Sequence, residues 1–171
     1  MRNQSGKFRW VLTIGVIIFA IGGTCLLTAC PDSSGSNAPV AAPSDPNGAG
    51  VRPNVRSYIE ATYQNSAKTR AALFQSAKVV EKALVDANNK DLSIQHAEES
   101  NRASTCLWYT FGSVDAYAKA QDGMMAVTLN TDERNKAYLV YNDQLGGQVF
   151  LGIPYDQRVT ACDINPSTLP N

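Results

Sequence analysis

The sequence contains little of what most enzymes and metalloproteins are built from. Its 171 residues include one histidine, His96, and four cysteines with no CxxC pair. The patterns GxxxxGK[ST], GxGxxG, GxSxG and HExxH are all missing; they mark phosphate loops, dinucleotide sites, serine hydrolases and zinc proteases. We therefore expect no enzyme, with no catalytic residue, no metal site and no bound cofactor.

The one histidine stands beside two acidic residues, Glu98 and Glu99, on a segment with helical character. Neighbouring side chains on a helix point about 100° apart, so these two carboxylates cannot easily act on one substrate. We expect His96 to lie on the surface or pack between helices rather than to serve as a catalytic base.

The chain also has no excess of charge, with 15 Lys+Arg against 15 Asp+Glu. Proteins that bind nucleic acid normally show a basic face or stripe. Around Trp108 and Tyr109 the only nearby cations are Arg102 and Lys119, so base stacking with phosphate contacts is not favoured. We expect no nucleic-acid partner. The length allows one ordinary domain, and the 44% apolar content is typical of a globular one.

The first thirty residues have the composition of a targeting segment. Three basic residues and no acid occur in 1–10, and 11–29 carry no charge. A basic start followed by an apolar stretch is typical of a secretory signal. This uncharged, mainly apolar stretch of 19 residues would also span a bilayer as a helix, so a retained transmembrane anchor is the alternative.

The tetrapeptide Leu27-Thr28-Ala29-Cys30 resembles the lipobox of bacterial lipoproteins. Cys25 lacks the preceding aliphatic residue and fits worse. The resemblance implies that residues 1–29 are a signal peptide that is cleaved off, and that Cys30 then carries S-diacylglycerol and N-acyl lipid, such as palmitate. Two or three acyl chains hold a protein on a membrane without a spanning helix. We expect a membrane-anchored domain that faces the periplasm, with the outer membrane favoured over the inner.

The mature chain would be mildly acidic, because 12 Lys+Arg and 15 acidic residues follow residue 29, a net charge of −3. Residues 31–53 hold five of the eight prolines, and their only large aliphatics are Val40 and Val51. Such a composition buries too little apolar surface to fold by itself. Residues 30–53 are therefore interpreted as the lipidated cysteine and a flexible tether, and 54–171 as a single domain.

Residues 54–111 contain neither glycine nor proline, which predicts helix. An apolar stripe, interrupted by Ser66 and Arg70, predicts one long helix from an Asn54 cap to about residue 87. We favour packing within the domain over an intermolecular coiled coil. A second helix is expected from Asp91 or Ser93 to Arg102. Residues 105–111 fit either a strand or more helix, and Gly112 then ends the element. A short helix capped by Ser113 is expected to follow.

Four later runs have the length and composition of strands. They are Met124–Leu129, Lys136–Tyr141, Gln148–Tyr155 and Arg158–Ile164. Short turn-like segments between them favour antiparallel connections. The sequence thus predicts an α+β domain, in which a long N-terminal helix and a shorter helix pack on a three- or four-stranded antiparallel β-meander.

Two cysteines remain after the lipidated one. In an oxidising compartment Cys106 and Cys162 are expected to form a disulfide; a redox or metal pair is the alternative. The bridge would close a loop of about 57 residues and contribute around 4 kcal/mol in the chain-entropy model.

The possible partner-binding residues are aromatic, because tyrosine and tryptophan are enriched at interface hot spots. They are Trp108, Tyr109, Tyr138 and Tyr141. The sequence favours a membrane-anchored, non-enzymatic lipoprotein that binds an envelope protein as an accessory module. The alternatives are an inhibitor or exclusion-type lipoprotein that blocks a hydrolase or incoming machinery, and an enzyme of unrecognised type.

Overall fold

The computed structural model describes residues 40–42 and 50–171, and within these ranges the chain is helical with no strand. The lipobox and Cys30 lie outside the described residues, as do most of residues 30–53. The elements, in chain order, are α1 (Pro53–Thr62), α2 (Ala67–Val85), α3 (Lys90–Phe111), α4 (Val114–Thr128), α5 (Asp132–Gln144), η1 (Tyr155–Ala161) and η2 (Pro166–Thr168), the last two being 3₁₀-helices.

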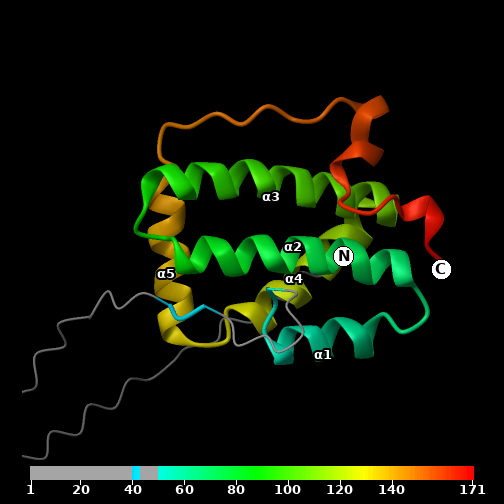
Figure 1. The fold of residues 1–171 in the computed structure, drawn as a ribbon, viewed down its shortest axis with the longest axis horizontal. Helices are drawn as coiled ribbons and strands as arrows, with labels where there is room; N and C mark the ends of the chain where they lie inside the picture. The colour runs from blue at the N-terminus through cyan, green and yellow to red at the C-terminus, as the bar shows by residue number, and fades with distance from the viewer. Residues whose placement is uncertain (1–39, 43–49) are drawn as a thin grey trace, which may run out of the picture. The chain divides into compact units, whose positions relative to one another are not determined.

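Helix α2 is the centre of the domain, because it contacts each of the other four α-helices (Figure 1). It runs beside α3, and α5 crosses one end of this pair. The main core consists of large side chains that are almost fully buried: Val55, Ile59, Leu73, Leu84, Leu107 and Met124. A smaller cluster joins Ala83, Ala87 and Ala97 to Tyr141 of α5. None of the helices in the described part of the chain is both long and apolar enough to cross a bilayer.

The predicted long helix is two helices, α1 and α2. Ser66 caps α2 by accepting a hydrogen bond from the Thr69 backbone N–H. Arg70 donates to the Tyr63 and Gln64 carbonyls at 2.8 and 2.6 Å, and these carbonyls have no intrahelical partner at the end of α1. The two polar residues that interrupt the apolar stripe therefore form the break. The first cap was also placed wrongly, because α1 begins with Pro53 at its first turn, after Arg52.

The second helix is longer than predicted. Asn89, rather than Asp91 or Ser93, caps α3 by accepting from the Leu92 N–H at 3.1 Å. The helix continues through residues 105–111, which resolves the alternative of strand or helix. It ends at Gly112, whose φ of 65° is in the left-handed region that favours glycine. Ser113 caps α4, as predicted.

The α+β prediction is wrong, because none of the four expected strands forms within the described residues. Residues 124–129 complete α4 and its cap, and 136–141 lie inside α5. Residues 148–154 are extended without a partner strand, and 158–164 belong to η1 and the loop after it. Short apolar runs fit a buried helix face as well as a strand. In α4 the buried positions Ala120, Met124 and Thr128 recur every four residues, which is a helical spacing.

The only two large aliphatic residues of the expected tether, Val40 and Val51, both pack on the main core. Val51 is almost fully buried. The following Arg52 bonds the buried carboxylate of Glu81 on α2, with Nε and Oε1 3.1 Å apart. The folded part of the chain therefore includes residues just before α1, which composition alone assigned to the tether.

Glu81 also pairs with Arg134 of α5 at 2.6 Å. Arg134 Nε donates to the carbonyl of Thr128, at the end of α4, and so does Arg52 Nη2. Burial lowers the pKa of the Arg134 guanidinium, although the Glu81 carboxylate opposes this. The network holds α2, the end of α4 and α5 in register, because each buried charge needs its partner.

Candidate partner-binding surface

The four predicted aromatic residues fall into two groups. Trp108 and Tyr109, on the last turns of α3, are 38% and 45% exposed. Tyr141 is only 6% exposed and packs with Tyr138, their ring centroids 6.0 Å apart on α5. Burial raises the pKa of Tyr141 to about 12, with a smaller contribution from Tyr138. The α5 pair therefore belongs to the packing of the domain, and the α3 pair faces solvent.

Arg158 of η1 lies over Trp108 of α3 and Tyr155 of η1. Its guanidinium carbon is 3.6 Å from the ring centroid of Trp108 and 4.6 Å from that of Tyr155. Cation–π contacts of this kind favour a guanidinium over an aromatic face. The Nε atom is buried and has no hydrogen-bond acceptor, and Arg158 makes no ion pair with any other described residue. Two rings thus hold a guanidinium that pairs with no carboxylate of the described residues.

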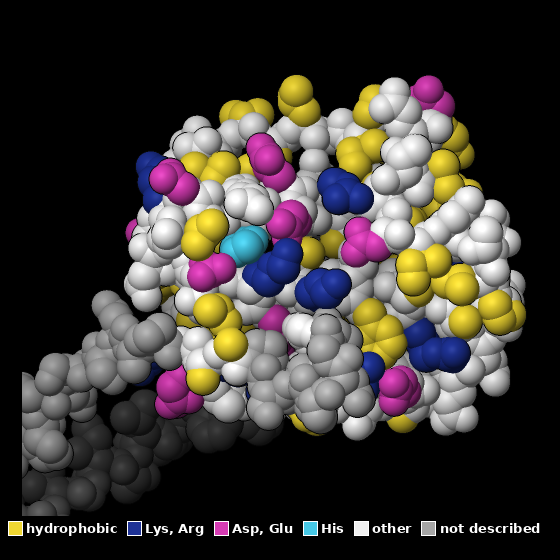
Figure 2. All heavy atoms as spheres, in the orientation of Figure 1, with side chains coloured by type: hydrophobic (Ala, Val, Ile, Leu, Met, Phe, Trp, Pro, Cys, Tyr) yellow, Lys and Arg dark blue, Asp and Glu magenta, His cyan; other side chains and the backbone are white. Residues whose placement is uncertain are grey.

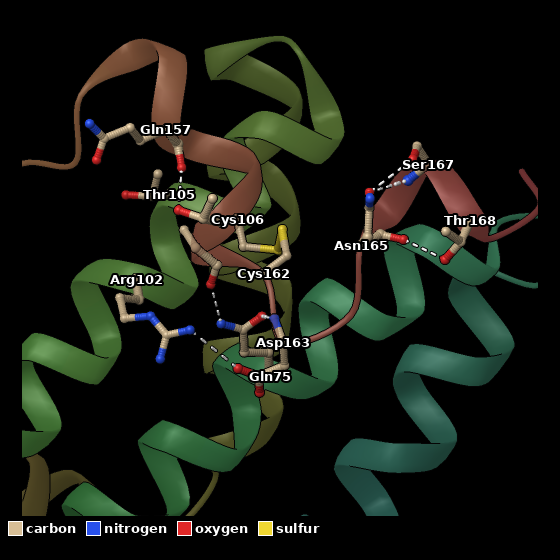
Figure 3. Close-up of a disulfide and its surroundings, with 12 residues drawn as sticks. Gln75, Arg102, Thr105, Cys106, Gln157, Cys162, Asp163, Asn165, Ser167 and Thr168 are labelled. Carbon is tan, nitrogen blue, oxygen red and sulfur yellow. Dashed lines mark hydrogen bonds and ion pairs between the residues drawn. A yellow bond between two sulfur atoms is a disulfide. The ribbon is translucent and has the colours of Figure 1, made fainter.

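The disulfide predicted from cysteine counting is present and holds η1 against α3 (Figure 3). Cys106 lies on α3 and Cys162 directly after η1, with their sulfur atoms 2.03 Å apart. Gln75 of α2 adds two hydrogen bonds: it donates to the Ala161 carbonyl at 2.8 Å and accepts from the Asp163 N–H at 3.0 Å. The position of Arg158 is therefore set by a covalent bridge and by backbone contacts to α2.

Residues 148–154 run extended from the end of α5 to η1, beside α3 (Figure 1). Asn101 of α3 donates to the Leu151 carbonyl at 2.7 Å, and Phe150 and Ile153 pack inward on the two core clusters. Val149 and Leu151 are each 86% exposed. In Figure 2, hydrophobic side chains project at the upper edge, where this segment runs.

We call these exposed groups together the α3–η1 surface; it consists of Trp108, Tyr109, Val149, Leu151, Tyr155 and Arg158. A pocket of about 290 Å³ adjoins it, between α3, α4 and the extended segment. Trp108 and Arg158 belong to both, and Arg158 is the only charged residue among the described residues that line the pocket. The sequence pointed to Trp108 and Tyr109, and to a strand-like run over 148–155. It gave no sign that Arg158 would join them, because that contact depends on the disulfide.

The histidine lies in a separate charged cluster between α2 and α3, where Figure 2 shows it among acidic and basic side chains. His96 Nε2 is 2.8 Å from Asp86, and Lys82 binds Glu99 at 2.8 Å. Burial opposes the charge of Glu99, but hydrogen bonds from Lys82 and Gln95 outweigh it and lower its pKa. Ser93, one turn before His96, is fully buried and cannot reach a substrate. The cluster links two helices, as expected for a histidine that packs between them.

No three His, Cys, Asp or Glu side chains of the described residues are grouped so that they could hold a metal ion. Comparison of the chain with protein-family models, curated proteins and solved structures finds no match. Its function is therefore argued from the chemistry of the α3–η1 surface.

Proposed function

We propose that the chain is a membrane-anchored periplasmic lipoprotein whose helical domain binds a protein partner in the cell envelope. The observation that carries this proposal is the α3–η1 surface, where five large apolar or aromatic side chains are exposed on α3, on η1 and on the segment before η1, and two of them, Trp108 and Tyr155, hold Arg158. Scattered exposed apolar residues are ordinary, whereas contiguous ones mark interaction sites. Tyrosine, tryptophan and arginine are also the residues that dominate interface energies.

The rigidity of the surface supports binding. Trp108 and Tyr109 extend from a 22-residue helix, and η1 is held to that helix by the disulfide. Side chains that are fixed before binding lose little conformational entropy in the complex, which raises affinity. We propose recognition rather than catalysis because large, preorganised apolar groups supply contact area and specificity.

The lipobox supports the anchored state. Acyl chains on Cys30 would confine the domain to one membrane face and raise its local concentration around an envelope partner. We expect Cys30→Ser to abolish metabolic labelling with radioactive palmitate, while Cys25→Ser leaves labelling intact. Label retained by the Cys30→Ser chain would refute lipidation at this cysteine.

Photo-crosslinking in intact cells tests the binding function. A photoreactive amino acid is placed at Tyr109 or Leu151 of the α3–η1 surface, and at Leu139 of α5, whose exposure lies between theirs, as the control. We expect the two surface positions, and not the control, to yield the same crosslinked envelope protein. The absence of a crosslink that is specific to the surface positions would contradict the proposal. If the captured protein is a hydrolase that the purified lipoprotein inhibits, the partner supports the inhibitor alternative.

A further inference from the structure

The extended segment has backbone groups that the fold leaves unpaired. The N–H groups of five consecutive residues, 149–153, donate to no group in the described part of the chain. Of the carbonyls of the same residues, only that of Leu151 accepts a hydrogen bond, from Asn101. An extended segment with free donors and acceptors is a template on which another strand can pair. Peptide-binding domains use such edges, where main-chain hydrogen bonds supply affinity.

The side chains of this segment suit a strand partner. Residues 145–155 carry no charge, and Val149 and Leu151 project into solvent from alternate positions. Apolar side chains opposite one another on paired strands stabilise the pairing. Phe150 and Ile153 hold the segment on the domain, so that it is already extended before a partner arrives. The segment has no partner strand within the described chain, and pairing with a strand of another protein accounts for its strand-like composition.

The pocket beside the segment adds a preference for charge. It is lined by Gly152 and Ile153 of the segment, by Trp108 of α3 and by Arg158, and no carboxylate lines it. The guanidinium is held by two rings, and none of its donors bonds an acceptor in the described part of the chain. A carboxylate is the group that complements a preorganised guanidinium with free donors.

We infer that the α3–η1 surface binds an extended segment of the partner protein, which pairs as a strand with residues 149–153 and places an acidic side chain on Arg158. The segment is apolar at alternate positions and carries one Asp or Glu. This inference rests on the proposed function and specifies the chemistry of the partner. An uncharged edge alone would accept a second copy of this chain, but the carboxylates nearest to the segment in another copy, Asp143 and Asp156, lie in α5 and η1 rather than in the extended run. Arg158 therefore favours an extended acidic segment of another protein.

Synthetic peptides test the inference by fluorescence anisotropy. The probes are ten-residue peptides that alternate Val and Thr and carry a single Glu at successive positions, each with a matched peptide in which Gln replaces Glu. The protein is the mature chain in detergent micelles. We expect at least one Glu peptide to bind about 10- to 100-fold more tightly than its Gln match. This ratio of dissociation constants is the one expected when a single charge-assisted hydrogen-bonded pair is lost.

Variants assign this preference to residues. Arg158→Gln should abolish the difference between Glu and Gln peptides, whereas Arg158→Lys should retain part of it. Leu151→Ala should weaken both peptides, and the matched control Leu139→Ala should weaken neither. If the Glu preference persists in Arg158→Gln, or if no peptide of the panel binds, the inference is wrong.

Amide hydrogen exchange reports the pairing itself. The amides of residues 149–153 should exchange rapidly in the free protein, and alternate amides should become protected when the peptide is bound. Protection that rises with protein concentration without peptide would identify a second copy as the occupant and overturn the inference. Peptide binding without protection in 149–153 would also overturn it. Crosslinking in cells separates the two proposals: a surface-specific envelope partner with no peptide binding leaves the function standing and removes only the strand mechanism.

Discussion

The buried carboxylate of Glu81 offers the sharpest test of what holds the helices together. It is 1% exposed and lies between Arg134, at 2.6 Å, and Arg52, at 3.1 Å. Glu81→Gln keeps the shape of the side chain and one acceptor oxygen, but it removes the negative charge between two guanidinium groups. Arg134 is then left buried without a counter-ion.

The size of the effect follows from this geometry. Removing one partner of a buried ion pair costs about 3–5 kcal/mol. Arg134 keeps its hydrogen bond to the Thr128 carbonyl, and Arg52 is partly solvated and has other acceptors. We therefore expect the lower end, about 3 kcal/mol, which is a large share of the roughly 5–15 kcal/mol that stabilises a typical domain.

Urea unfolding of the mature chain measures this difference. The control is Glu60→Gln, because Glu60 pairs with Arg56 at 3.9 Å on the surface and is more than half exposed. Exposed pairs of this kind contribute about 0.5 kcal/mol or less. Glu81→Gln should lower the transition midpoint with little change in slope. A loss within about 0.5 kcal/mol of the Glu60→Gln value would refute the reasoning, since it would mean that the buried pair is no stronger than the exposed one.

Three further predictions concern the bridge, one tyrosine and one close helix contact. Replacing Cys106 and Cys162 by Ala opens a loop with a sequence separation of 56 and should lower the free energy of unfolding by about 4 kcal/mol. The prediction is contradicted if the native chain is equally stable with and without a reductant. Burial raises the pKa of Tyr141 from 10.0 to about 12. The protonated hydroxyl therefore contributes fully to the free energy of unfolding below pH 10, and this contribution is lost as the pH rises toward 12. Tyr141→Phe should remove that part of the alkaline fall in stability, and an unchanged pH profile would argue against it. Gly123→Ala should destabilise the domain by about 1–3 kcal/mol, despite the better helix propensity of alanine, because the new Cβ meets the Tyr58 hydroxyl. The same substitution in a Tyr58→Phe background should cost less. If Gly123→Ala stabilises the domain, Tyr58 moves away at little cost and the prediction is wrong.

The correct parts of the sequence-based fold prediction concern features that a few neighbouring residues decide. Gly112 ends α3 and Ser113 caps α4, as expected. The pairing of Cys106 with Cys162 followed from counting cysteines. The polar interruption at Ser66 and Arg70 was visible as well, but it was interpreted as a flaw in one helix rather than as a boundary between two.

The candidate site was only partly predictable, for reasons of burial. Trp108 and Tyr141 are both aromatic residues in apolar runs, and nothing local separates them. Packing of α5 against α2 and α3 buries Tyr141, whereas the end of α3 leaves Trp108 partly exposed. Arg158 joins the surface from fifty residues further along the chain, through contacts that no sequence spacing encodes.

The sequence by itself determined where α3 ends and α4 begins, because capping needs only a hydrogen-bonding side chain or a permissive glycine within about four residues. The tertiary structure decided that 124–129 and 136–141 are helical, because each run has apolar residues for either a helix face or a strand. It also decided that Val149 and Leu151 face solvent and that Arg158 covers Trp108. Those outcomes depend on which distant elements cover a side chain, and on the bridge that holds η1 to α3.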